Sequence, residues 1–287
     1  MTCTLRNTIA LLRALRVALH LGYGLTLTLI YPWLGLSMRR RILQRWSVEL
    51  LEIFNVRSEF SDLHTMRTWT PGVIVTNHIS WLDIFVLNAL VPMRFVAKSE
   101  VRNWPLIGYL AARVQTLFIE RDKPRDAARI NRQIVELLQN GEFLAVFPEG
   151  TTTDGCSVGA FHASLLQPAI DAGVPVHPLA IRYQDEQGTH SLAAAYIDDL
   201  SLLESLWKLL NCRQLHVRLR STPSLDTSAC DRRTLSGHAH RQISAAVAAM
   251  HAQASPEALL LPEASFQSMY AMLLVPPVSQ PCNTAVD

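Results

Sequence analysis

The chain has 287 residues, of which 49% are apolar and only 17% are charged, and its formal net charge is +2. The charged fraction lies below the usual quarter of a soluble domain, which favours contact with a membrane. Seven arginines but one acidic residue, Glu49, lie in the first 50 positions, so the positive charge suits an anionic membrane surface rather than nucleic acid.

The N-terminal segment contains a long uncharged stretch. From Val17 to Ser37 there are 21 residues without a formal charge, and arginines flank the stretch on both sides. This length is about one bilayer span, and no signal-peptide cleavage site is obvious, so we expect an uncleaved membrane anchor. Because positive charge lies at both ends, a full span and a shallow insertion by two short helices both remain open.

Apolar residues then recur at helical spacing from Ile42 to Phe54, beside Arg41 and Arg45. The pattern predicts an amphipathic helix in the membrane interface, or alternatively a helix that packs on the core. Residues 57–72 are predicted to be a polar connection. We therefore expect a membrane anchor with an interfacial helix in 1–56, a folded domain in 57–252 and a loosely ordered tail in 253–287.

Strand and helix patterns alternate through the folded domain. The predicted strands are 73–76, 94–97, 116–120, 143–147, 176–183 and 215–219, and the predicted helices are 80–90, 100–112, 124–139, 162–172 and 231–252. This alternation predicts an α/β fold with a mixed sheet flanked by helices. Sites in such sheets lie beyond the strand ends, and His78, Lys98, Arg121 and Glu149 each follow a predicted strand.

His78 and Asp83 form the first candidate pair. A neutral imidazole can take a proton from a hydroxyl near neutral pH, and a carboxylate on its other nitrogen fixes the tautomer. Residues five apart do not share a helix face. We therefore expect His78 in a turn and Asp83 in the first helical turn, with Ser80 as N-cap. A polar turn and a helix cap without a catalytic role would give the same pattern.

A second polar loop follows the strand 143–147 and reads Pro-Glu-Gly-Thr-Thr-Thr-Asp-Gly over residues 148–155. Its backbone N–H groups and hydroxyls suit an anion or a polyol, although an ordinary loop has the same composition. No motif surrounds Cys156 that would mark it as a nucleophile. The five cysteines are scattered, which predicts neither a disulfide framework nor a metal site and suits a reducing compartment.

Four motifs together resemble those of the glycerolipid (lysophospholipid) acyltransferase family. They are Asn-His-x-Ser-x-x-Asp at Asn77–Asp83, Phe-Ile-Glu-Arg at Phe118–Arg121, Phe-Pro-Glu-Gly-Thr at Phe147–Thr151 and an apolar strand after Val-Pro at Val174–Ile181. Their order matches that of the family. The resemblance implies that His78 is the general base and Asp83 its partner.

The resemblance also implies a set of substrate-binding residues. Lys98 and Arg121 are expected to bind a phosphate or another anionic head group, with a surface salt bridge as the alternative for each. Glu149 is expected to bind acceptor hydroxyls or to brace the loop. Backbone donors near Gly150 and Thr151 are expected to stabilise the oxyanion or the head group.

Thr152 departs from the family pattern. Many members carry at this position an Arg that is thought to hold the phosphate of the acceptor. The version Phe-Pro-Glu-Gly-Thr-Thr-x-Asp-Gly, which ends at Gly155, is similar to the bacterial subgroup that includes lyso-ornithine lipid acyltransferases.

The activity implied by the resemblance is transfer of a fatty acyl chain from acyl-CoA or acyl-carrier protein to a lysolipid hydroxyl. The expected acceptor is 1-acyl-sn-glycerol-3-phosphate, giving phosphatidic acid, with lyso-ornithine lipid as the alternative. No metal, bound cofactor or nucleic acid is expected, and the site should face the cytoplasm at the cell inner membrane. Two other classes are a hydrolase that releases the acyl chain to water and a catalytically silent lipid-binding protein.

Overall fold

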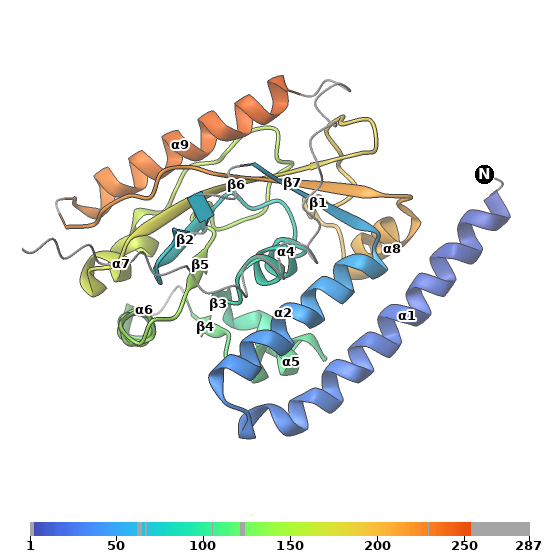
Figure 1. Ribbon diagram of the computed structural model, residues 1–287, viewed down its shortest axis with the longest axis horizontal. Helices are drawn as coiled ribbons and strands as arrows, with labels where there is room; N and C mark the ends of the chain where they lie inside the picture. Colours follow the sequence, from blue (N-terminus) through green and yellow to red (C-terminus); the bar gives the residue numbers. More distant parts are fainter. Residues whose placement is uncertain are drawn as a thin grey trace, which may run out of the picture.

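The computed structural model describes residues 3–61, 65–66, 68–104, 106–120, 124–228 and 230–253. Within these residues seven strands form one sheet in the order β1-β7-β6-β2-β5-β3-β4 (Figure 1). Strands β6 and β7 are antiparallel, whereas the other neighbouring strands are parallel. The predicted fold, a mixed α/β sheet flanked by helices, is therefore confirmed.

Six of the strands were predicted within a few residues of their observed ends. The strands are β1 Val56–Ser61, β2 Val73–Thr76, β3 Arg94–Lys98, β4 Leu117–Ile119, β5 Leu144–Val146, β6 Val176–Gln184 and β7 Leu215–Ser221. The prediction of a polar connection over 57–72 was wrong at its start, because β1 lies there. Polar residues are tolerated in this edge strand since Glu59 pairs with His216 and Arg218 of β7.

The helices also match most predictions. They are α1 Cys3–Ile30, η1 Tyr31–Trp33, α2 Leu36–Ile53, α4 Asp83–Leu90, η2 Ser99–Asn103, α5 Ile107–Arg113, α6 Pro124–Gln139, η3 Ala163–Leu166, α7 Gln167–Ala172, α8 Leu202–Asn211 and α9 Arg232–Ala252. The single helix predicted over 100–112 is instead split into η2 and α5. Trp104 is extended at ψ 127°, as expected for a residue before proline. Helix α8 was not predicted, although Ser201 and Glu204 form a capping box at its start.

Side chains alternate between two cores, one on each face of the sheet. Val73 and Val75 of β2 face a core shared with α6, α7 and α9, whereas Ile74 faces a core shared with α2, α4 and α8. Figure 1 shows α9 along one side of the sheet and α4 and α2 on the other, with α1 outermost. The carboxyl end of β2 therefore lies between two packed layers, which hold the segment that follows it.

The N-terminal helices form a hairpin. Helix α1 continues through Gly22 and Gly24 and ends at Ile30, and the chain returns as α2 (Figure 1). By length and composition, the segment Asn7–Trp33 is long and apolar enough to cross a membrane. The helix predicted over 42–54 is part of α2, and its residues from Val48 to Phe54 pack in the core, which is the alternative that the pattern left open. The predicted tail, apart from residue 253, lies outside the described residues.

Candidate active site

The site begins where β2 leaves the sheet. Asn77 follows β2 directly, and its side-chain amide exchanges two hydrogen bonds with the backbone of Ile181 in β6, at 2.9 and 2.8 Å. The amide therefore continues the pairing of β2 with β6 by one residue. This fixes the point at which the next residue, His78, turns away from the sheet.

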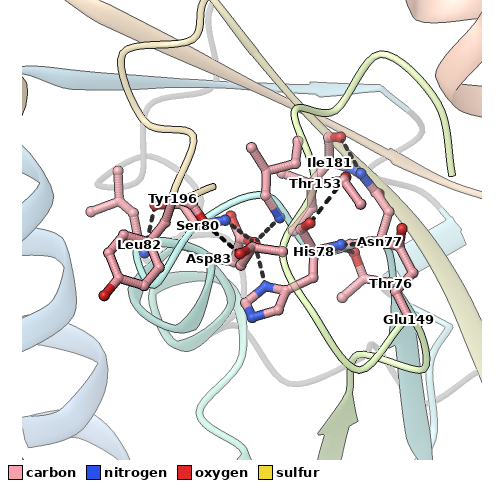
Figure 2. A network of polar contacts seen from close by, with 12 residues as sticks. Thr76, Asn77, His78, Ser80, Leu82, Asp83, Glu149, Thr153, Ile181 and Tyr196 are labelled. Carbon is pink, nitrogen blue, oxygen red and sulfur yellow. Dashed lines mark hydrogen bonds and ion pairs between the residues drawn. The ribbon is translucent and has the colours of Figure 1, made fainter. Parts of the chain in front are cut away.

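His78 and Asp83 lie together, as the spacing predicts. The imidazole Nδ1 of His78 is 2.9 Å from Oδ2 of Asp83, which is fully buried, whereas the His78 side chain is 18% exposed. Because an ionised carboxylate only accepts hydrogen bonds, Nδ1 carries the proton and Nε2 keeps its lone pair. Figure 2 shows the second ring nitrogen of His78 facing away from Asp83. The ring also stacks on Phe147 at a centroid distance of 3.9 Å.

Further donors hold the Asp83 carboxylate. Oδ2 accepts the backbone N–H groups of Ile79 and Ser80 at 2.8 and 3.0 Å. Oδ1 accepts the hydroxyl of Tyr183 at 2.8 Å. Burial, followed by the charge of Asp83, raises the pKa of Tyr183 well above its ordinary value, so that the phenol remains a donor. These contacts hold the carboxylate in a fixed orientation.

The prediction that Ser80 caps the helix was wrong. Helix α4 begins at Asp83, its N-cap is Leu82, and no side chain caps it. The Ser80 hydroxyl accepts the N–H of Leu82 at 3.2 Å instead. Only the reverse half of the capping box forms, in which Asp83 accepts the Ser80 N–H. The Asp83 carboxylate instead binds the backbone of the turn that precedes it, and α4 begins at Asp83 rather than at residue 80.

Glu149, after β5, fixes the backbone of the same turn. Its carboxylate accepts the N–H of His78 through Oε1 and the N–H of Gly159 through Oε2, each at 2.7 Å (Figure 2 shows the first pair). Burial raises the pKa of Glu149, and the two hydrogen bonds oppose this rise. A Cβ at Gly159 would lie 2.9 Å from Oε2, so the close approach requires glycine.

The loop after Glu149 is fastened to the histidine turn. Gly150 has φ 72° and donates its N–H to the Phe147 carbonyl at 3.1 Å. The Thr152 hydroxyl donates to the Tyr196 carbonyl, and the Thr153 N–H donates to the His78 carbonyl at 2.8 Å. In the described part of the chain, the backbone N–H groups of Thr151 and Thr152 donate to no other residue.

The two predicted basic residues are placed differently. Lys98 is the exposed last residue of β3, and β3 is separated from β2 by β5 alone. Because these strands are parallel, their carboxyl ends share one edge of the sheet, so Lys98 lies at the same edge as His78. Arg121 lies outside the described residues.

Tyr183 is the residue at the site that sequence reasoning missed. It lies in β6 in an apolar run and is fully buried, which is typical of a core residue. Its contact with Asp83 spans 100 residues of sequence. A tyrosine rather than phenylalanine in a buried strand was the available signal, because a buried hydroxyl requires a partner.

The site thus presents a partly exposed imidazole, held by a buried carboxylate, beside a polar loop. In the comparisons with known proteins, a family model described as Acyltransferase matches residues 57–182. The chain is 37% identical to the lyso-ornithine lipid O-acyltransferase of Pseudomonas aeruginosa over 208 residues, which is 72% of the chain and 78% of that protein. The chain belongs to this acyltransferase family.

Two further proteins are similar to the chain. The chain is 41% identical over 149 residues to the 1-acyl-sn-glycerol-3-phosphate acyltransferase of Neisseria meningitidis, and this match spans 52% of the chain and 58% of the relative. The crystal structure of a 1-acyl-sn-glycerophosphate acyltransferase from Thermotoga maritima superposes with a TM-score of 0.66 at 18% identity, covering 88% of this chain and 99% of that chain. The second match shows a shared fold.

Proposed function

We propose that the chain moves a fatty acyl group from acyl-CoA or acyl-carrier protein to the hydroxyl of a lysolipid, with 1-acyl-sn-glycerol-3-phosphate as acceptor and phosphatidic acid as product. The observation that carries this proposal is the partly exposed His78, whose Nδ1 is held by the buried Asp83. A base in this arrangement takes a proton from a hydroxyl at neutral pH.

The chemical step follows from the free Nε2 of His78. Nε2 takes the proton of the acceptor hydroxyl, and the oxygen attacks the thioester carbonyl carbon to form a tetrahedral oxyanion. When this intermediate collapses, the C–S bond breaks, the new ester forms, and the leaving thiolate takes the proton from Nε2. Asp83 stabilises the imidazolium between the two transfers. The chain and the two substrates supply every group, so no metal or bound cofactor enters the proposal.

The loop after Phe147 supports stabilisation of the oxyanion. The N–H of Gly150 is engaged with the Phe147 carbonyl. Thr151 is exposed, and neither its N–H nor that of Thr152 donates to another described residue. We therefore assign the oxyanion contact to these two N–H groups, which belong to the same loop as Glu149.

We assign binding of the acceptor's head group to the edge of the sheet at which Lys98 and His78 lie. Lys98 lies at this edge, and Arg121 follows β4 in sequence. Lyso-ornithine lipid is the second candidate acceptor, for two reasons. Thr152 replaces the Arg found in many relatives, and its hydroxyl already donates to Tyr196. The relative named for lyso-ornithine lipid also matches over more of the chain than the Neisseria relative does.

Helix α1 supports a shallow association with the membrane. One face, including Ala10, Val17 and His20, is buried, while large apolar side chains on the rest of the helix and on η1 are exposed. These exposed side chains are Leu11, Leu12, Leu15, Leu19, Tyr23, Leu29, Ile30 and Trp33. Such a helix suits insertion in the plane of the interface.

Contacts with the folded domain favour this mode over a full span. The Arg13 guanidinium donates to the carbonyls of Leu210, Cys212 and Arg213 at the end of α8. Crossing the bilayer would break these contacts. We place the site on the cytoplasmic side of the inner membrane, where its thioester substrates are found.

Acyl transfer by purified, detergent-solubilised protein tests the proposal. Radiolabelled acyl-CoA is offered with 1-acyl-sn-glycerol-3-phosphate or lyso-ornithine lipid, and products are separated from free fatty acid. We expect diacylated lipid from the wild type and at least about a thousandfold less from His78→Ala. Free fatty acid as the main product would indicate a hydrolase, and binding of lysolipid without either product would indicate a silent lipid-binding protein.

A further inference from the structure

Tyr183 has a hydroxyl that core packing does not explain. The side chain is fully buried within β6, in the core shared with α2, α4 and α8. A phenylalanine would fill nearly the same space without placing a polar group in the interior, where an unpaired hydroxyl costs free energy. The hydroxyl is paired with Oδ1 of Asp83 at 2.8 Å, so its partner is the carboxylate that holds the proposed base.

The two oxygens of Asp83 have different partners. Oδ2 accepts hydrogen bonds from Nδ1 of His78 and from the backbone N–H groups of Ile79 and Ser80. In the described part of the chain, Tyr183 is the donor to Oδ1, and no second donor to this oxygen is present. Asp83 is fully buried, so bulk water does not contact this oxygen while the phenol is in place. The phenol therefore sets the rotation of the carboxylate about its Cβ–Cγ bond.

Pairing of β2 with β6 explains how Tyr183 reaches Asp83. The side chain of Asn77 binds both backbone groups of Ile181, two residues before Tyr183. Side chains two residues apart in a strand share a face, and both Ile181 and Tyr183 lie in the core that contains α4. The same strand thus fixes the start of the histidine turn and supplies the donor to Asp83.

We propose that Tyr183 is a positioning residue for the His78–Asp83 pair, acting through Oδ1 of the carboxylate. This inference rests on the proposed function. The phenol holds the carboxylate plane so that Oδ2 faces Nδ1, and it withdraws negative charge from the carboxylate. Both effects set how strongly Asp83 supports the protonated ring.

Tyr183→Phe removes the hydroxyl while keeping the aromatic ring. We expect kcat to fall about tenfold, as for loss of one hydrogen bond to a charged group, with KM unchanged. A carboxylate without the phenol is more negative and stabilises the protonated form of the neighbouring ring more strongly. The acid limb of the pH profile of kcat/KM should therefore move to higher pH, which a purely structural loss would not produce.

A double-mutant cycle with Asp83→Asn gives the decisive comparison. If Tyr183 acts through the carboxylate, Tyr183→Phe lowers kcat in the wild type but has little further effect in the Asp83→Asn background. An equal loss in both backgrounds, or no loss in the wild type, would overturn the proposal. Tyr31→Phe is the matched control, since Tyr31 is also buried but lies in η1, and it should leave kcat unchanged.

Replacement of Tyr183 by 3-fluorotyrosine keeps the proposal testable if Tyr183→Phe unfolds. Fluorine makes the phenol a stronger donor, so the acid limb should move to lower pH, opposite to the phenylalanine variant. An unmoved acid limb would contradict the proposal. The wild type and His78→Ala are measured in the same assay. If the proposed function is wrong, the wild type itself shows no His78-dependent acyl transfer. If only the role of Tyr183 is wrong, the wild type is active and the acid limb of the fluorotyrosine variant does not move.

Discussion

Glu149 accepts the backbone N–H of His78 at 2.7 Å, so two carboxylates from different segments fix one residue. Asp83 holds the ring through Nδ1, while Glu149 holds the backbone of the turn. The loop that carries Glu149 also returns to the turn, because Thr153 donates to the His78 carbonyl. The position of the base thus depends on β5 as well as on β2.

Glu149→Gln should weaken this arrangement, because an amide NH₂ must replace one of the two oxygens that accept backbone N–H groups. We expect the free energy of unfolding to fall by about 1–3 kcal/mol and kcat to fall roughly ten- to a hundredfold. Chemical denaturation and initial rates measure the two effects. The exposed Glu136 gives the control Glu136→Gln, and equal effects of the two variants would contradict the bracing role.

Gly159→Ala tests the same contact from the other side. A Cβ at this position would lie 2.9 Å from Oε2 of Glu149, so the loop must shift, and we expect a lower kcat and a lower melting temperature. Gly22→Ala is the matched control, since its Cβ would meet nothing within 4 Å, and it should stabilise α1 by up to about 1 kcal/mol. Unchanged activity in Gly159→Ala would argue against the tight approach.

Thr152 is expected to influence acceptor choice. Thr152→Arg introduces a cation beside the histidine turn and should raise the ratio of kcat/KM for 1-acyl-sn-glycerol-3-phosphate over lyso-ornithine lipid by about tenfold. Thr152→Val removes the donor to the Tyr196 carbonyl and should lower both rates to a similar extent. A ratio that is unmoved by Thr152→Arg would exclude this position from head-group recognition.

The buried His177 should make the stability of the protein depend on pH. Burial lowers the pKa of His177, opposed by its hydrogen bond to the Thr70 carbonyl. At a pH just below the ordinary histidine pKa, the ring is protonated in the unfolded chain but stays neutral in the folded chain. The free energy of unfolding should therefore fall as pH drops below the ordinary histidine pKa of about 6.5.

Denaturation of the wild type and His177→Gln between about pH 7.5 and about pH 5.5 measures this effect. The variant should show a shallower loss of stability on acidification. His162→Gln serves as control, because His162 is exposed. Identical slopes for the wild type and His177→Gln would show that another group causes the dependence.

The exposed apolar surface of α1 and η1 should bind lipid. Leu29→Asp with Trp33→Asp places two charges on this surface, where the native side chains are 69% and 87% exposed. We expect weaker flotation with vesicles containing anionic lipid and unchanged activity in detergent. Leu203→Asp on α8 is the control, since Leu203 is equally exposed at 76%. Loss of flotation in the control alone would place the lipid contact on α8.

The sequence predicted those features that depend on local pattern. Buried parallel strands are continuous apolar runs, so β2 and β5 were recognisable, and the carboxyl ends of these strands indicated His78 and Glu149. Strand β1 was missed because its charges pair with β7 across 157 residues or more. The cap at Ser80 was wrong because the Asp83 carboxylate takes backbone donors before α4 starts.

Long-range contacts could not be derived from pattern in the same way. Tyr183 resembles any core aromatic until β6 is placed beside β2. The burial of α2 likewise depends on α4, which packs against the apolar face of α2. From periodicity alone, that face could equally have contacted lipid. The positions of the motif residues were therefore predictable, whereas the residues that hold the motif required the fold.

The steady-state rate of acyl transfer by His78→Ala, compared with the wild type at saturating thioester and lysolipid, tests the central claim most directly. We predict that kcat falls by at least about a thousandfold, the order expected for loss of a general base together with its orienting contact. The KM values should stay within a few-fold, because the proposed head-group and oxyanion contacts are made by residues other than His78. Transfer by His78→Ala at a rate near that of the wild type would contradict the account.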